Sequence, residues 1–144
     1  MTEPWNDRAD ERVISEFRAH NGVVGGSLAG LSLLLLHHVG ARSGAERVTP
    51  LAYWQLTNTS VAVLASNFGA SQHPGWHHNL MAHPIASVEI GTTTWNVRAR
   101  VARSDERRDV LERITRLTPQ VARVIAHTRR EIPVVVLDRI EAYA

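Results

Sequence analysis

Histidines gather in one short stretch, where their spacing permits several kinds of chemistry. Asn67–Leu80, NFGASQHPGWHHNL, holds His73, His77 and His78, three of the eight histidines in the chain. His73 and His77 are four residues apart, which can place two imidazoles on one face of a helix. However, a proline follows His73, and the stretch offers no glutamate, aspartate or cysteine to complete a zinc set. We expect no metal here, and a histidine-based hydrolase or metal protein is the weaker alternative.

The same stretch predicts a short helix that could meet a flat ring. Proline suits the first position of a helix and a second proline stops it, so we expect a helix over Pro74–His83. One face would carry Trp76, Asn79 and Leu80, at spacings of three and four residues. A tryptophan beside an amide suits the edge of a heteroaromatic ring, and burial of Trp76 in the core is the alternative.

A second candidate site is the loop Val39–Pro50, VGARSGAERVTP. Its glycines allow tight turns, while Arg42, Ser43 and Arg47 offer guanidinium groups, a hydroxyl and exposed backbone N–H groups. Arginine binds planar oxyanions through two hydrogen bonds, and turn amides form anion-binding nests. The loop therefore suits a phosphate or a carboxylate. A solvated hairpin with surface arginines is the alternative.

The elements that must position these residues are short and separated by turn residues. Apolar and alternating runs predict about six strands, over Leu31–His38, Arg47–Gln55, Ser60–Ala65, Ala86–Ile90, Thr93–Ala102 and Ile132–Ile140. Besides the helix above, helices are expected over Asn6–His20, over Asp105–Leu117 with Ser104 as N-cap, and from Thr118-Pro119 to His127 with the same cap signature. The pattern predicts one α+β domain over residues 1–144, with residues 1–22 as an N-terminal helix and arm. Its strands would form a mostly antiparallel barrel or sheet.

Composition narrows the class of protein. The 144 residues are 44% hydrophobic and 21% charged, as in ordinary globular proteins. The net charge is only +2, and the arginines are scattered without an aromatic platform, so nucleic-acid binding is not expected. Cysteine is absent, which excludes disulfides and thiol nucleophiles and makes the cytoplasm the default location. The apolar run Leu31–Leu36 is much shorter than the about 20 residues of a membrane span.

Four segments taken together resemble the deazaflavin-dependent nitroreductase family. They are LLLLHHVGARSGAERVTPL, VLASNFGASQHPGWHHNL, MAHPIASVEIG and REIPVVVL, and the resemblance runs in order from about Val13 to Leu137. It implies a split β-barrel like that of flavin-binding proteins. It also implies binding of the reduced 8-hydroxy-5-deazaflavin coenzyme F-420, with FMN as the less favoured substitute.

The resemblance further implies which residues hold the coenzyme. On the loop, the phosphate-bearing tail would be held by Arg42, Ser43, Gly44 and Arg47. Along the same groove would lie Ser66, Asn67 and Gly69. The ring system would be flanked from the helix by Trp76 and Asn79.

The chemistry in this interpretation belongs to the coenzyme, which passes a hydride to an electron-poor small molecule such as a quinone, an enone or a nitro-aromatic. No catalytic dyad is expected; His77 and His78 are the candidate proton donors, and surface or cap histidines are the alternative. A non-catalytic barrel that binds a flavin-like or lipid ligand is the rival, favoured by Ala41, Asn67 and Phe68 where family members carry other residues. Barrels of this kind are often dimers, so a homodimer is expected by resemblance.

Overall fold

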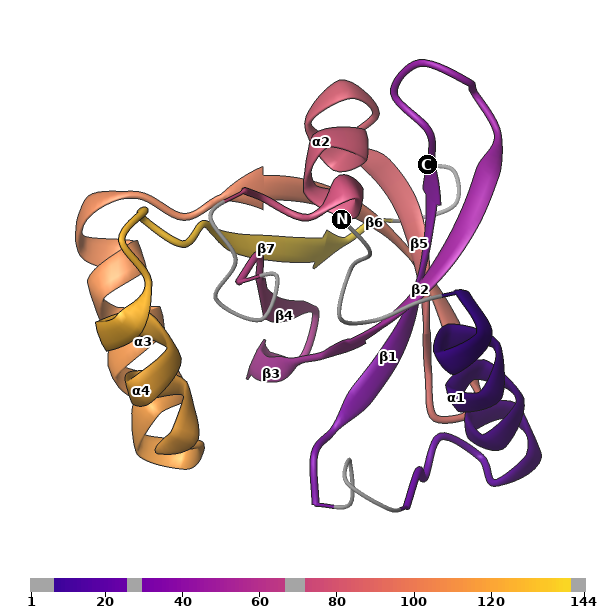
Figure 1. Ribbon diagram of the computed structural model, residues 1–144, viewed down its shortest axis with the longest axis horizontal. Coiled ribbons are helices and arrows are strands. Elements are labelled where there is room, and N and C mark those ends of the chain that lie inside the picture. Colours follow the sequence, from indigo (N-terminus) through magenta and orange to yellow (C-terminus); the bar gives the residue numbers. More distant parts are fainter. Residues whose placement is uncertain (1–6, 26–29, 67–71, 141–144) are drawn as a thin grey trace.

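The computed structural model describes residues 7–25, 30–66 and 72–140 (Figure 1). The helices are α1 (Asp7–Ala19), α2 (Gly75–Ala82), α3 (Ser104–Leu117) and α4 (Gln120–His127). The strands are β1 (Leu33–Val39), β2 (Glu46–Ala52), β3 (Trp54–Thr57), β4 (Ser60–Leu64), β5 (Ile85–Ile90), β6 (Thr93–Val101) and β7 (Val134–Arg139). The paired helices α3 and α4 lie at one end of the molecule and α1 at the other.

All seven strands join one antiparallel sheet in the order β2-β1-β5-β6-β7-β4-β3. The sheet curls, so that β2 at one edge comes close to β4 near the other. The expected α+β fold with a mostly antiparallel split barrel is confirmed. A hairpin turn at Thr57–Ser60 joins β3 to β4, and the two strands pair across it.

The single strand expected over Arg47–Gln55 is wrong, because the chain turns a corner inside this run. Its first part is β2, which pairs with β1. Its second part is β3, which pairs with β4 at the opposite edge of the sheet. Between them the Tyr53 N–H donates to the Ser32 carbonyl at 3.0 Å. One apolar run therefore supplies both edge strands, which raises the strand number from about six to seven.

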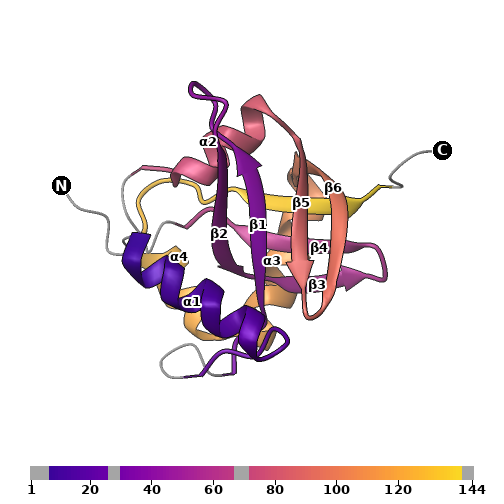
Figure 2. The ribbon, with the colours of Figure 1, turned by 90° about the vertical axis from the view of Figure 1, so that its right-hand side faces the viewer.

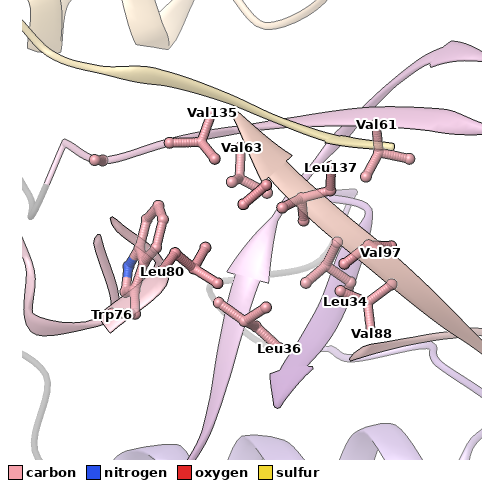
Figure 3. Close-up of a cluster of buried hydrophobic side chains, with 12 residues drawn as sticks. Leu34, Leu36, Val61, Val63, Trp76, Leu80, Val88, Val97, Val135 and Leu137 are labelled. Atoms are coloured by element: carbon pink, nitrogen blue, oxygen red, sulfur yellow. The ribbon is translucent and has the colours of Figure 1, made fainter. Parts of the chain in front are cut away.

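Strand β1 is buried on both faces, which explains its unbroken leucines. Leu34 and Leu36 point into the curl of the sheet, within a cluster that also contains Trp76 and Leu80 of α2 (Figure 3). Leu33 and Leu35 belong to a second cluster, with side chains of α1 such as Phe17. The strand thus fixes α1 on one side and the inner core on the other.

Helix α3 covers the outer face of the sheet, and the caps expected for α3 and α4 are wrong. Val110 and Ile114 pack with residues of β4 and β7, whereas Leu117 is 61% exposed. Ser104 is the first helical residue, with φ of 53°, and no side chain caps the helix. The hydroxyl of Thr118 accepts a hydrogen bond from Trp54 Nε1 at 2.9 Å instead of capping α4.

A backbone approach at Gly22 gives a stability prediction. Gly22 has φ of 94°, and a Cβ there would lie 2.8 Å from the Cα of Gly91. Gly22→Ala should therefore lower the free energy of unfolding by about 1–3 kcal/mol. Gly75→Ala is the matched control, because nothing lies within 4 Å of its added Cβ. Urea unfolding of both variants checks this, and equal midpoints would contradict it.

Candidate functional site

A cavity of about 570 Å³ lies between the β1–β2 hairpin, α2 and α4. That volume is typical of pockets for small organic ligands. Its polar lining comprises Asp10, His38, Arg47, Thr49, Ser66 and Asn79. Its apolar lining includes Leu33, Trp54, Trp76, Val121, Val124 and Ile125. A polar part and an apolar part in one cavity suit a ring with polar edges.

Four of the residues expected to hold a coenzyme line this cavity. They are Arg47, Ser66, Trp76 and Asn79, which come from separate parts of the chain. Arg47 is exposed, so it stands at the rim of the cavity, and it forms no ion pair within the described part of the chain. Of the other five expected residues, three do not line the cavity and two are not among the described residues.

The expected residues of the loop belong to an exposed turn beside the cavity. Arg42, Ser43 and Gly44 are exposed and do not line the cavity. The Ser43 hydroxyl accepts from the Ala45 N–H at 3.1 Å, and Gly44 has φ of 70°, so both residues shape the turn. Asn67 and Gly69 lie outside the described residues.

Asn79 connects this turn to α2. Its Oδ1 accepts a hydrogen bond from the Ala41 N–H at 2.9 Å, and its Nδ2 lies 3.0 Å from His38 Nδ1. Figure 2 shows α2 beside the turn that closes the β1–β2 hairpin. The loop motif and the helix motif, which are about 38 residues apart in the chain, therefore meet at one side chain.

His38 is the functional residue that the sequence reasoning missed. It is 4% exposed and lines the cavity, and its Nε2 lies 2.9 Å from the Thr49 hydroxyl. Burial lowers the pKa of His38 to about 4, helped by the charges of Arg47 and His37. The imidazole is therefore neutral. The signal was available, because strand alternation puts His38 on the same face as Leu34 and Leu36.

The candidate proton donors His77 and His78 do not line the cavity. The ring of His77 is 8% exposed and lies 4.7 Å from the ring of His73. Burial lowers the pKa of His77 to about 4, with the charges of His73, His78 and Arg130 acting in the same direction. Its Nδ1 has no hydrogen-bond partner among the described residues. A neutral, buried imidazole away from the cavity is poorly placed to donate a proton.

His73 has a structural contact instead. Arg130 donates to His73 Nδ1 at 2.6 Å and to the carbonyls of Ala65 and Ser66 at 2.9 Å. These bonds join the chain that leads into β7 to the end of β4 and the start of α2. Within the described ranges, no group of three or more His, Asp or Glu side chains is arranged to hold a metal ion.

Trp76 belongs to the core, as one of the two interpretations expected, and it also lines the cavity. It is 6% exposed and packs in the inner core with Leu80, and its side chain also lines the cavity (Figure 3). The opposite wall is the apolar face of α4, through Val121, Val124 and Ile125. No residue of α4 is fully buried.

The chain is similar to known proteins in sequence and in structure. The model of a family described as F420H(2)-dependent quinone reductase matches residues 11–139. The chain is 33% identical over 129 residues to an F420H(2)-dependent quinone reductase of Mycobacterium tuberculosis, which covers 85% of each chain. It also resembles a solved F420-H2 dependent reductase, at 31% identity and a TM-score of 0.67, over 74% of this chain and 93% of the other.

A further solved structure, described as a domain-swapped dimer, is 28% identical with a TM-score of 0.69. The match covers 89% of this chain and 96% of that one. No helix in the described ranges is long and apolar enough to cross a membrane.

The two neutral buried histidines predict a pH dependence of stability. Because the pKa of His38 and of His77 is about 4 when folded and about 6.5 when unfolded, the unfolded chain binds more protons between these values. The free energy of unfolding should be highest above pH 6.5 and should decrease toward pH 4. Each of the two histidines should lower it by at most about 1.4 kcal/mol per pH unit.

Urea unfolding at pH 7, 6, 5 and 4.5 checks this. His77→Leu should reduce the slope by about half, since one of the two protons is no longer taken up. A free energy of unfolding that stays constant from pH 7 to 5 would contradict the neutral state of both side chains.

Proposed function

The chain belongs to the F420H(2)-dependent quinone reductase family, and we propose that its cavity holds the reduced deazaflavin coenzyme beside the quinone that it reduces. The protein is an oxidoreductase that moves a hydride from reduced coenzyme F-420 to a quinone. The observation that carries the proposal for the site is the meeting of Arg47, Ser66, Trp76 and Asn79 around one cavity.

The cation and donor groups at the polar part fit the coenzyme. The guanidinium of Arg47 stands at the rim, where it can pair with a phosphate of the tail. A tail that leaves past Arg47 would run along the exposed turn that carries Arg42 and Ser43. Ala41, which departs from the family's basic residue, still contributes its backbone N–H to Asn79. This departure therefore removes a charge without removing the contact between turn and helix.

The apolar part fits the quinone. Val121, Val124 and Ile125 of α4 line the same cavity as Trp76 and offer no charged group. An apolar wall expels water from the reacting atoms and strengthens electrostatic interactions there. We therefore propose that this chain prefers an acceptor with apolar substituents to one with hydrogen-bonding substituents.

The protein contributes to the reaction by positioning the two ligands and by excluding water from them. When bound, the reduced coenzyme supplies the hydride, and a proton completes the conversion of the quinone to the hydroquinone. Arg47 and Asn79 orient one ligand at the polar part, and α4 and Trp76 confine both ligands at the apolar part. Solvent supplies this proton in the proposed reaction, because neither His77 nor His78 lines the cavity.

We also propose a homodimer and a cytoplasmic location. The dimer is supported by the similar structure described as a domain-swapped dimer. Size-exclusion chromatography with light scattering tests the dimer, and a mass of one chain at micromolar concentration would contradict it.

Removing an arginine side chain of this loop should weaken coenzyme binding more than it lowers the thermal stability of the protein. Arg47→Ala and Arg42→Ala each remove a charge-assisted hydrogen bond, worth about 1.5–3 kcal/mol, so the Kd for oxidised F-420 should rise about 10- to 100-fold. Tryptophan fluorescence measures the Kd, and thermal unfolding measures stability. Arg116→Ala is the control, since Arg116 is an exposed residue of α3 outside the cavity lining. Equal losses of affinity in all three variants would reject the tail site.

A polar substitution in the apolar wall should weaken the binding of the quinone and leave the binding of the coenzyme unchanged. Val124→Thr keeps the shape of the side chain and adds a hydroxyl, so the KM for an alkylated quinone should rise about 3- to 10-fold. The Kd for the coenzyme should stay unchanged, because Val124 lies on α4 away from Arg47. Steady-state kinetics with the Val124→Ile variant as control checks this. A changed coenzyme Kd with unchanged quinone KM would reverse the assignment of the two ligands.

A further inference from the structure

Four groups form a continuous chain of hydrogen bonds that ends in the cavity. It begins at the Ala41 N–H, which donates to Asn79 Oδ1 at 2.9 Å. It continues from Asn79 Nδ2 to His38 Nδ1 at 3.0 Å, and from His38 Nε2 to the Thr49 hydroxyl at 2.9 Å. The last three residues all line the cavity.

The direction of every bond in this chain is determined by its first member. A backbone N–H only donates, so the oxygen of the Asn79 amide must face Ala41 and its NH₂ group must face His38. His38 Nδ1 therefore accepts, and the proton of the neutral imidazole is on Nε2. Nε2 donates it to the oxygen of Thr49. Three side chains are thus held in one orientation by a single amide of the turn.

The hydrogen of the Thr49 hydroxyl takes part in none of these hydrogen bonds. Its oxygen already accepts from His38, and a hydroxyl carries one hydrogen to donate. Among the described residues, the hydroxyl of Thr49 has no second hydrogen-bond partner. Thr49 lines the cavity, so this hydrogen is available to an acceptor in the cavity.

We propose that Thr49 is a fixed hydrogen-bond donor to a ring carbonyl oxygen of a molecule bound in the cavity, and that Asn79 and His38 are positioning residues that set its direction. The inference rests on the proposed function, since the deazaflavin ring and the quinone both present carbonyl oxygens. A quinone oxygen gains negative charge as the hydride arrives, and a preorganised donor stabilises such charge. A carbonyl of the deazaflavin would instead be held equally before and after transfer.

The surroundings keep the direction of the chain fixed at neutral pH. Protonated His38 would point a second N–H at the Asn79 NH₂ group, which also only donates. Burial, Arg47 and His37 all oppose that proton, so the pKa of His38 lies well below neutrality. The nearby groups facing His38 are the neutral Asn79 and Thr49, and neither supplies a charge that would favour the imidazolium.

Thr49→Val tests the donor directly, because it removes the hydroxyl and keeps the shape. If the acceptor is on the quinone, kcat/KM for the quinone should fall at least about tenfold with the coenzyme Kd unchanged. If it is on the coenzyme, the Kd for oxidised F-420 should rise by a similar factor. Thr49→Ser keeps the hydroxyl and should stay within about threefold in both measurements. Unchanged Kd and unchanged kcat/KM in a folded Thr49→Val protein would overturn the proposal.

His38 is tested by substitution and by its tautomer. Glutamine can accept from Asn79 and donate to Thr49, so His38→Gln should retain activity that His38→Leu loses. In the Thr49→Val background, His38→Leu should cause little further loss, since the two act as one unit. Additive losses would contradict a shared chain.

A nitrogen-15 NMR spectrum of the histidine side chains at pH 7 gives a readout without ligand, in case His38→Leu does not fold. The signal that His38→Gln removes should be that of a neutral ring with its proton on Nε2, and a proton on Nδ1 would overturn the inference. A wild-type protein that neither binds F-420 nor reduces quinones would instead contradict the proposed function, while leaving this tautomer as expected.

Discussion

The corner at Tyr53 governs the architecture on which the site depends. A straight continuation of β2 would have kept one edge of the sheet flat. Instead, the backbone bond from Tyr53 to Ser32 is the last one in register with β1, and from Trp54 onward the chain pairs with β4 near the far edge. The sheet must curl for one segment to reach both edges. The curl brings Thr49 of β2 and Ser66, which follows β4, to the walls of one cavity.

Within this curled sheet, Asn79 determines how the β1–β2 turn and α2 meet beside the cavity. Without it, the glycine-containing turn and α2 would be neighbours with no defined contact. Its amide bonds a backbone group of the turn on one side and a buried imidazole on the other. The resemblance implied a role for Asn79 at the coenzyme ring, and the structure adds a role between protein groups. Both roles require the same fixed orientation of the amide.

The sequence predicted the helices and strands better than the strand break and the helix caps between them. Periodicity located each helix within a few residues, because apolar spacing is a local property. It missed the break between β2 and β3, since only the long-range pairing with β1 and β4 decides where the run divides. The cap predictions at Ser104 and Thr118 failed for a related reason. The Thr118 hydroxyl bonds Trp54, a partner 64 residues away that outweighs the local preference.

For the site, motif spacing indicated the right segments and misjudged which side chains turn inward. The three histidines of Asn67–Leu80 attracted chemical hypotheses, yet His73 is held by Arg130 and His77 is buried outside the cavity. His38, at the end of a leucine run, looked like part of a strand and lines the cavity. Alternation along β1 separates His38 from His37. The register of β1 against β2 pairs His38 with Arg47 and Leu36 with Thr49, so the Thr49 hydroxyl lies within reach of His38 on the same face.

Helix α4 has a consequence for how proteins with this fold diversify. Its apolar side chains line the cavity and none is fully buried, although Val121 also packs against the outer core cluster. Under the proposed function, Val124 and Ile125 therefore contact the ligand more than the core. Mutations there can change the acceptor at little cost in folding free energy. The residues at the polar part are tied into the β1–β2 hairpin and α2, where change is costly. Selection can therefore alter one substrate over many generations while the redox partner is inherited unaltered.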